Sequence, residues 1–256
     1  MNIMDKFSLK GRKAIVTGGA RGLNRGMAEG LHEAGAEIVL FDILDQVYET
    51  AKEMSTPEAP VYAVKGDITD KESREKAFQE ALDFLGYRLD ILINGAGIQY
   101  RCDAVDFPEE KLKQILDVNL VGLFCMAQLS ARVMIEQGYG RIINIGSLST
   151  IFGASMIAGY TASKGGVSQV TKVMSTEWAG KGVNVNCLCP GYMATDLTKD
   201  IATKNPTQYA NINARLPKGR WGTEEDLKGA AVFLASEAAD YITGTSLVID
   251  GGYTVK

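Results

Sequence analysis

Two side chains that could move a proton, Tyr160 and Lys164, stand four residues apart within a segment of helical pattern. On an α-helix this spacing places both side chains on one face. A tyrosine hydroxyl has a pKa of about 10 and is a poor acid or base at neutral pH, but a neighbouring ammonium group stabilises the phenolate and lowers that pKa. We therefore expect this pair to exchange a proton with a substrate oxygen.

The same spacing recurs at Tyr48 and Lys52, so spacing alone does not identify a site. The surroundings favour Tyr160, because it lies in a segment without charge, 142–163, that is rich in Ser, Thr, Gly and Asn. Ser147 stands in this segment, just past the end of a predicted strand. Ligands of open α/β sheets bind at the carboxyl ends of the strands, so Ser147 is expected to present its hydroxyl there. A serine that only caps the loop is the alternative.

A glycine-rich turn suits a phosphate ligand. The run Thr17-Gly18-Gly19-Ala20-Arg21-Gly22-Leu23 follows the first predicted strand directly and leads into a helix. Glycines in such a turn let the backbone approach a pyrophosphate, whose charge then meets the helix N-terminus. A tight turn without a ligand is the alternative, but this turn occupies the first strand-to-helix connection, where dinucleotide-binding folds carry it.

Two acidic residues follow the next strands. Asp42 ends the second predicted strand, at the distance from the turn where a carboxylate can accept hydrogen bonds from the adenosine ribose and repel a 2′-phosphate. It therefore favours NAD over NADP. Arg21 could pair with that phosphate, but it can also turn into solvent, so we expect Asp42 to decide. Asp67, after the third predicted strand, could hydrogen-bond the adenine amino group; either carboxylate could also simply end its strand.

Short apolar runs alternate with helical patterns along the chain. Most runs are almost continuously apolar, as expected of strands covered on both faces. Strict alternation with short connections predicts a parallel sheet wrapped by helices. The predicted strands are 13–17, 36–42, 61–65, 90–94, 141–145, 183–188 and 246–250, and the predicted helices are 23–34, 71–85, 109–137, 158–180 and 224–236.

No linker, repeat or shift in composition divides the 256 residues, so we expect one domain over 1–256. Residues 193–216 follow a predicted strand, have weak periodicity and carry many polar side chains. We expect a mobile substrate lid there.

The composition argues against several classes of protein. With 46% hydrophobic residues, 23% charged residues and a net charge of −4, the chain resembles neither a disordered protein nor a coiled coil, and we expect no nucleic-acid partner. The four cysteines form no CxxC and His32 is the only histidine, so we expect no metal site. Reduced thiols and the lack of a secretory signal predict a cytoplasmic protein. The apolar segment 118–131 is too short to span a bilayer, so we expect no membrane partner.

Several short motifs occur in a fixed order: Thr17-Gly18…Gly22, Asp67, Asn94-Gly95-Ala96-Gly97, Asn119, Ser147, Tyr160…Lys164 and Pro190-Gly191. In this order they resemble the short-chain dehydrogenase/reductase family over essentially the whole chain. The resemblance implies a Rossmann-type, doubly wound α/β fold of about seven parallel strands with helices on both faces. It also implies an enzyme that transfers a hydride between a nicotinamide cofactor and a carbonyl/alcohol pair.

The resemblance further implies roles for single residues. Tyr160 is the expected acid–base group, Lys164 lowers its pKa and holds the nicotinamide ribose, and Ser147 orients the substrate oxygen. Asn119 sustains a proton relay, and Thr195 contacts the carboxamide or the phosphates. The full set expected to bind the cofactor is Gly18, Arg21, Gly22, Leu23, Asp42, Asp67, Ile68, Asn94, Ala96, Gly97, Tyr160, Lys164, Pro190, Gly191, Met193 and Thr195.

Two positions depart from the family pattern. The phosphate turn usually ends in Gly where this chain has Asn24, and the family's Asn-Asn-Ala-Gly is here Asn94-Gly95-Ala96-Gly97. Asn24 adds bulk where helix and strand should pack closely around the pyrophosphate, so we expect weaker cofactor binding. Gly95 removes a side chain that could brace the central strands. Neither position belongs to the expected catalytic set, so we expect activity to persist.

Four segments, 97–101, 142–148, 190–195 and 219–222, are similar to members of this family that act on sugar acids of the gluconate type. Arg101 lies just beyond the fourth predicted strand, and a planar guanidinium can bind a carboxylate through two hydrogen bonds. Gln99 and Tyr192 could then bind substrate hydroxyl groups, together with Ser147 and Tyr160. An exposed loop cation is the alternative for Arg101.

Two other functions stay open. A 3-oxoacyl-carrier reductase of the same family would usually need NADPH and a basic docking surface, which Asp42 and the acidic balance disfavour. A catalytically silent nucleotide sensor would tolerate the changes at Asn24 and Gly95, but the intact catalytic set argues against it. Similar family members are commonly homotetramers, and residues 246–256 resemble their C-terminal segment, so we expect a homotetramer.

Overall fold

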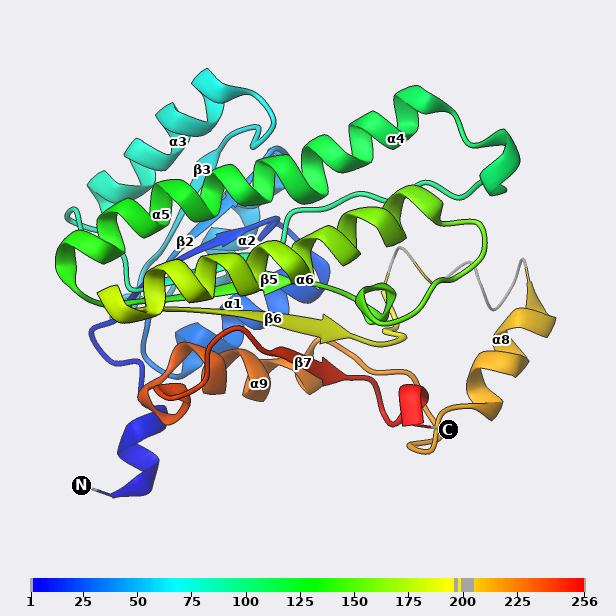
Figure 1. The fold of residues 1–256 in the computed structure, drawn as a ribbon. Coiled ribbons are helices and arrows are strands. Elements are labelled where there is room, and N and C mark those ends of the chain that lie inside the picture. The colour runs from blue at the N-terminus through cyan, green and yellow to red at the C-terminus, as the bar shows by residue number, and fades with distance from the viewer. Residues whose placement is uncertain (1, 196–197, 199–204, 256) are drawn as a thin grey trace.

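Seven parallel strands form one sheet at the centre of the molecule (Figure 1). The computed structural model describes residues 2–195, 198 and 205–255. The strand order is β3-β2-β1-β4-β5-β6-β7. The predicted single-domain, doubly wound parallel sheet is confirmed. The strands are β1 (Lys13–Thr17), β2 (Glu37–Asp42), β3 (Val61–Lys65), β4 (Ile91–Asn94), β5 (Gly140–Ile145), β6 (Val183–Pro190) and β7 (Ser246–Ile249).

The direction in which the sheet grows reverses between β1 and β4. From β1 the chain first adds β2 and β3 on one side, and then returns to place β4 and the later strands on the other side. The helices that follow β1 and β4 therefore cover opposite faces of the sheet. In open α/β sheets such a reversal leaves a crevice at the carboxyl ends of the two strands, where ligands bind.

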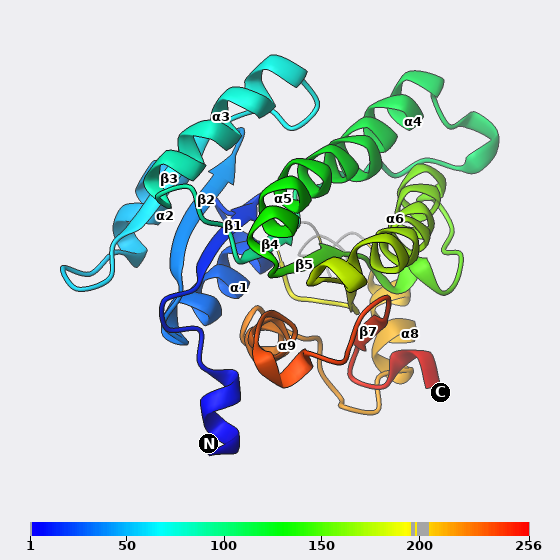
Figure 2. The same ribbon diagram turned by 60° about the vertical axis from the view of Figure 1, so that its left-hand side comes forward.

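Helices cover both faces of the sheet, as Figure 2 shows. One face packs against α1, α2 and α9, and the other against α3, α5 and α6. Neighbouring residues of a strand point to opposite faces, so Ala14 and Val16 join the first core and Ile15 joins the second. The helices are α1 (Gly22–Glu33), α2 (Gln46–Met54), α3 (Lys71–Phe84), α4 (Glu109–Leu116), α5 (Leu123–Gln137), α6 (Ala158–Trp178), α8 (Pro206–Ala214) and α9 (Glu225–Ala235).

The predicted helix over 109–137 is interrupted. Helix α4 ends at Leu116, a π-helical turn follows over Asp117–Gly122, and α5 continues from Leu123. The extra residue per turn does not alter the apolar spacing enough to be seen in the sequence. Such turns often mark functional positions, and this one contains Asn119.

Two short helices were not predicted. Helix α2 buries Val47, Ala51 and Met54, which have helical spacing, and it accounts for the second Tyr-x-x-x-Lys pair as an ordinary surface helix pair. Helix α8 lies within 193–216, where we predicted a lid. Residues 196–197 and 199–204 of that segment lie outside the described part of the chain, so the lid stays a prediction.

The segment Glu109–Gln137 is long and apolar enough to cross a membrane, judged by length and composition alone. In the structure Met126, Ala127 and Met134 of this segment are fully buried in the core formed by the sheet, α3 and α6. Core packing therefore accounts for the high hydropathy of its second half.

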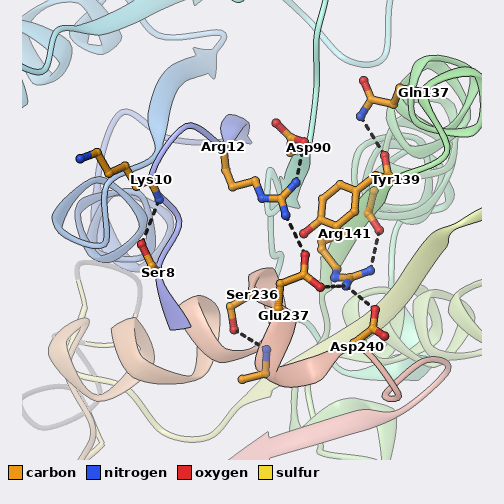
Figure 3. Close-up of polar contacts among 12 residues, drawn as sticks. Ser8, Lys10, Arg12, Asp90, Gln137, Tyr139, Arg141, Ser236, Glu237 and Asp240 are labelled. Carbon is orange, nitrogen blue, oxygen red and sulfur yellow. Dashed lines mark hydrogen bonds and ion pairs between the residues drawn. The ribbon is translucent and has the colours of Figure 1, made fainter. Parts of the chain in front are cut away.

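A polar cluster closes the amino-terminal edge of the sheet, opposite the crevice (Figure 3). The buried carboxylate of Asp90 accepts hydrogen bonds from Arg88 Nε at 2.9 Å, from Arg12 Nη1 at 3.3 Å and from the Lys13 amide at 3.0 Å. Arg12 also contacts Glu237 at 2.7 Å, and its guanidinium lies 3.9 Å from the centre of the Tyr139 ring. The cluster thus ties β1 and β4 to the segment after α9.

We expect Asp90→Ala to reduce the free energy of unfolding by about 3 kcal/mol, because it leaves Arg12 without its buried partner and removes the acceptor of the Lys13 amide. Urea unfolding measures the loss. The matched control is Glu109→Gln, which breaks an exposed ion pair with Lys113 and should cost less than about 0.5 kcal/mol. Equal, small losses in both variants would contradict the structural role of Asp90.

Candidate active site

A cleft of about 1030 Å³ lies at the carboxyl ends of the central strands, at the reversal between β1 and β4. It connects the glycine turn and the end of β2 with Tyr160 and Lys164 of α6. The two sets of residues that the sequence indicated are thus brought to one cavity. Its described lining is Gly18, 21–24, 41–44, 66–69, 95–99, Glu110, Lys113, Gln114, Asp117, Val118, Ile145, Tyr160, Lys164 and Thr195.

The glycine turn forms the floor of one end of the cleft. Gly18 has a φ of +70°, and a Cβ at this position would lie 2.9 Å from the Cα of Ala96, so only glycine lets the turn approach the end of β4. Helix α1 begins at Gly22, and its N-cap residue Arg21 makes no side-chain capping hydrogen bond. A Cβ on Gly22 would meet no protein atom within 4 Å. Open space beside an uncapped helix N-terminus suits the phosphates of a dinucleotide.

The carboxylate of Asp42 is fixed at this end of the cleft. It is only 8% exposed, and it accepts hydrogen bonds from the Ala20 amide at 3.0 Å and the Leu44 amide at 3.0 Å. These two bonds hold the carboxylate against the glycine turn, where it can still accept bonds from ribose hydroxyls. Arg21 lines the same cleft, and its side chain is exposed, which leaves it room to turn into solvent.

Asp67 and Ile68 line the cleft beside the end of β3. The Asp67 carboxylate accepts hydrogen bonds from the Thr69 amide at 2.8 Å and the Thr69 hydroxyl at 2.7 Å. The hydrogen bonds from Thr69 therefore fix the orientation of the Asp67 side chain in the cleft. Its predicted hydrogen bond to the adenine amino group stays a prediction.

The catalytic candidates meet at the other end. Tyr160 lies in the first turn of α6, and the side chain of Ser147, which follows β5, is near enough to its hydroxyl to lower its pKa by hydrogen bonding. Lys164 is 3% exposed, its Nζ donates a 2.6 Å hydrogen bond to the Ile145 carbonyl, and it lies 5.6 Å from the centre of the Tyr160 ring. The helix spacing and the strand end thus bring the three side chains together as predicted.

The direction of one pKa shift differs from expectation. Burial raises the pKa of Tyr160, and the hydrogen bond from Ser147 acts against this rise. Burial also lowers the pKa of Lys164 to about 8. The net shift of the Tyr160 pKa is therefore upward, opposite to the lowering expected from the neighbouring ammonium, because burial is the largest effect.

Asn119 occupies the π-helical turn and is fully buried. Its Oδ1 accepts a hydrogen bond from the Ile98 amide at 2.8 Å, and its Nδ2 donates to the Ile98 carbonyl at 2.9 Å and to Ser163 Oγ at 3.1 Å. Ser163 in turn donates to the Tyr160 carbonyl at 2.7 Å. Asn119 therefore connects the loop after β4 to the backbone of the catalytic helix; the predicted proton relay stays a prediction.

Two buried thiols behind the catalytic lysine were not predicted to matter for the site. Cys187 and Cys189 are two residues apart on β6, so their side chains lie on the same face of the sheet, and their sulfurs are 3.6 Å apart. Their hydrogen bond lowers the pKa of Cys189 to about 6 and raises that of Cys187. Negative charge on either thiol raises the pKa of Lys164 and opposes the effect of its burial. In the sequence, the sign of this contact is the spacing of two residues between the cysteines in a strand, which places both thiols on one face.

Several residues predicted to bind the cofactor are not part of the described cleft lining. Asn94 is buried and donates to the Leu123 carbonyl at 2.7 Å, so its contacts are structural. Pro190 ends β6, and the amide of the next residue, Gly191, donates to the Ile249 carbonyl of β7 at 2.9 Å. Met193 is buried, whereas Thr195 does line the cleft. For these positions the cofactor role remains a prediction.

The predicted substrate residues divide between two neighbouring places. Gln99 lines the cleft. Tyr192 instead packs against Tyr253, with ring centres 4.9 Å apart, and burial raises its pKa to about 12. The positive charges of Arg101 and Arg215 act on the Tyr192 pKa in the opposite direction, and the Arg215 guanidinium lies 4.3 Å from the centre of the Tyr253 ring. Arg215 and Tyr253 were not predicted, because they come from α8 and from the C-terminal turn, far along the sequence.

The chain is similar to known proteins over nearly its whole length. A family described as enoyl-(acyl carrier protein) reductase matches residues 18–254. The chain is 41% identical to a 2-dehydro-3-deoxy-D-gluconate 5-dehydrogenase of Bacillus subtilis, with 97% of each chain covered, and 37% identical to an NAD-dependent glycerol dehydrogenase of Listeria innocua, with 98% of this chain and 96% of the relative covered. The crystal structure of a gluconate 5-dehydrogenase from Burkholderia cenocepacia with NADP and tartrate has a TM-score of 0.95 at 37% identity, with 100% of both chains covered.

The matches cover nearly the whole chain, and the structural match extends over the entire fold. The chain belongs to the short-chain dehydrogenase/reductase family of nicotinamide-dependent oxidoreductases.

Proposed function

We propose that the protein is an NAD-dependent dehydrogenase that interconverts a secondary alcohol and a ketone on a sugar acid of the gluconate, 2-deoxygluconate or 2-keto-3-deoxygluconate type. The observation that carries this proposal is that Tyr160 and Lys164, with Ser147 beside the tyrosine, line one end of a cleft whose other end holds the glycine turn and Asp42. The names of relatives such as the 2-dehydro-3-deoxy-D-gluconate 5-dehydrogenase support the substrate class.

The chain itself supplies the proton chemistry. Tyr160 gives a proton to the substrate oxygen in reduction and takes one from it in oxidation, while Ser147 holds the same oxygen by a hydrogen bond. Lys164, anchored on the Ile145 carbonyl, keeps a positive charge beside the Tyr160 ring. The nicotinamide cofactor, when bound, supplies the hydride donor or acceptor.

The substrate carboxylate is best matched by the guanidinium groups near Tyr192. Arg101 lies in the loop after β4 and Arg215 at the end of α8. Both positive charges act electrostatically on the same tyrosine, and a pair of guanidinium groups suits an anionic ligand. Gln99, in the cleft itself, is placed to bind a hydroxyl group.

Preference for NAD rests on the fixed position of Asp42. A 2′-phosphate at the ribose would stand beside a carboxylate that is held in place by two backbone amides. The glycerol dehydrogenase relative is named as NAD-dependent, whereas the gluconate 5-dehydrogenase structure contains NADP, so relatives of both kinds occur. By analogy with family members we also propose a cytoplasmic homotetramer.

A reductase of acyl groups on a carrier protein is the second candidate, because the matching family is described as an enoyl-(acyl carrier protein) reductase. The net charge of −4 provides no general attraction to an acidic carrier. The two candidates are distinguished by offering both substrate classes, with each cofactor, to the same purified protein.

We expect Tyr160→Phe to lower kcat for sugar-acid oxidation at least about 100-fold, because it removes only the oxygen that carries the proton. NADH absorbance measures turnover, with gluconate, 2-deoxygluconate and 2-keto-3-deoxygluconate offered in turn, beside simple alcohols and an acyl-thioester substrate. Tyr48→Phe, in the other Tyr-x-x-x-Lys pair and 48% exposed, is the matched control and should leave kcat unchanged. Full turnover in Tyr160→Phe would refute the mechanism.

We expect Asp42→Asn to lower the ratio of kcat/KM for NAD to that for NADP at least about tenfold. The amide keeps the size of the side chain but removes the charge that repels a 2′-phosphate, and a tenfold change corresponds to about 1.4 kcal/mol. Asp45→Asn, which removes an exposed partner of Lys65, is the control for a nearby change of charge. An unchanged or increased ratio in Asp42→Asn would contradict the assignment.

The pKa directions predict different pH profiles for the two directions of reaction. Oxidation needs a deprotonated Tyr160, whose pKa is raised, so kcat/KM for oxidation should rise with pH throughout the range above 7. Reduction needs the protonated phenol, which persists until the pH reaches that raised pKa, so its kcat/KM should stay level or fall, and not rise, over the same range. Initial rates in both directions test this. Parallel profiles for oxidation and reduction would be inconsistent with Tyr160 as the acid–base group.

A further inference from the structure

The side chain of Asn24 joins two turns that belong to different strands. Asn24 lies in the first turn of α1 and lines the cleft. Its Nδ2 donates to the Gly95 carbonyl at 2.9 Å, just after β4, and approaches the Gly18 carbonyl in the glycine turn at 3.3 Å. One amide group therefore fastens the phosphate end of β1 to the end of β4.

This arrangement requires that position 95 carry no side chain. A Cβ built on Gly95 would overlap Asn24 Oδ1 and would lie 2.5 Å from its Cγ and 2.8 Å from its Nδ2. The space next to Gly95 is thus filled by the amide of Asn24. A Cβ on Gly18 would also come within 2.8 Å of Asn24 Nδ2, so both glycines make room for the same side chain.

A threonine completes the attachment from the other side. Thr17 Oγ1 accepts hydrogen bonds from the Gly95 amide at 2.9 Å and the Ala96 amide at 3.2 Å. The peptide at Gly95 is therefore held at its nitrogen by β1 and at its oxygen by α1. These contacts fix the separation of two walls of the cleft, on either side of the crevice between β1 and β4.

We propose that Asn24 and Gly95 form a matched pair, and that Asn24 is a positioning residue for the phosphate end of the cleft. The two departures from the family pattern are then a single exchange, in which an amide side chain is supplied from α1 instead of from the turn after β4. The bracing side chain that Gly95 lacks is thus supplied by Asn24. The expectation that Asn24 weakens cofactor binding stays a prediction, which the Kd of the variants tests. The identity of the positioned ligand rests on the proposed function, whereas the pairing concerns the protein alone.

Four variants test the pairing: Asn24→Gly, Asn24→Leu, Gly95→Ala and the double variant Asn24→Gly/Gly95→Ala. The leucine keeps nearly the same shape but cannot donate hydrogen bonds. Two readouts are used, the urea midpoint of the protein without ligand and the Kd for NADH and NADPH from fluorescence titration. Gly229→Ala is the control, because it is an exposed glycine on α9 whose added Cβ would meet no atom within 4 Å.

We expect Gly95→Ala to lower the urea midpoint and to raise the Kd at least about tenfold, because the new methyl group displaces the Asn24 amide. Removing that amide as well relieves the overlap, so the double variant should lose no more than Asn24→Gly alone and should bind more tightly than Gly95→Ala. Asn24→Leu should fold but raise the Kd about threefold to tenfold, through loss of the two hydrogen bonds. The control variant should match the wild type in Kd.

Additive effects of Asn24→Gly and Gly95→Ala on both readouts would overturn the pairing. Coupled urea midpoints with an unchanged Kd in Asn24→Leu and Gly95→Ala would overturn the positioning role. If the wild type bound neither NADH nor NADPH while the midpoints were still coupled, the pairing would stand, and the proposed function would fall together with the positioning role.

Discussion

The close approach of the backbone at Gly18 to the backbone at Ala96 is the constraint on which the site depends. A parallel sheet that reverses its direction of growth separates the helices on either side of β1 and β4, and the crevice between them becomes the one place where a ligand meets both. The crevice is useful only if its walls are close and fixed. Glycine at position 18 permits the approach, and Thr17 and Asn24 hold it by bonds to the turn after β4.

Hydrogen bonds also fix the position of the helix at the catalytic end of the cleft. The π-helical turn places Asn119 where it bonds to the loop after β4 and to Ser163 of α6, so the helix that carries Tyr160 is set relative to the crevice. Burial then determines the ionisation of the groups held there: it raises the pKa of Tyr160 and lowers that of Lys164. A protonated phenol beside a lysine that titrates near neutral pH is suited to passing a proton in either direction.

Much of the fold could be predicted from the sequence, because strands buried on both faces are continuous apolar runs and the helices between them have one apolar side. The π-helical turn could not, since Asp117–Gly122 keeps the apolar pattern of the helices it joins. At the site, Ser147 and Tyr160 were found because a strand end and a helix spacing determine their positions. Arg215 and Tyr253 were missed because only the folded chain brings them to Tyr192, and the contact between Asn24 and Gly95 was missed because Gly95 has no side chain to suggest it.

A crystal structure of the protein with NADH and a sugar-acid ligand tests the central claim most directly, namely that one cleft joins a dinucleotide site to the acid–base tyrosine. We expect the pyrophosphate at the turn between Gly18 and Leu23, the adenosine ribose at Asp42, and the substrate oxygen within hydrogen-bonding distance of both Ser147 and Tyr160. A dinucleotide bound elsewhere, or a substrate oxygen turned away from Tyr160 in the fully occupied complex, would contradict it.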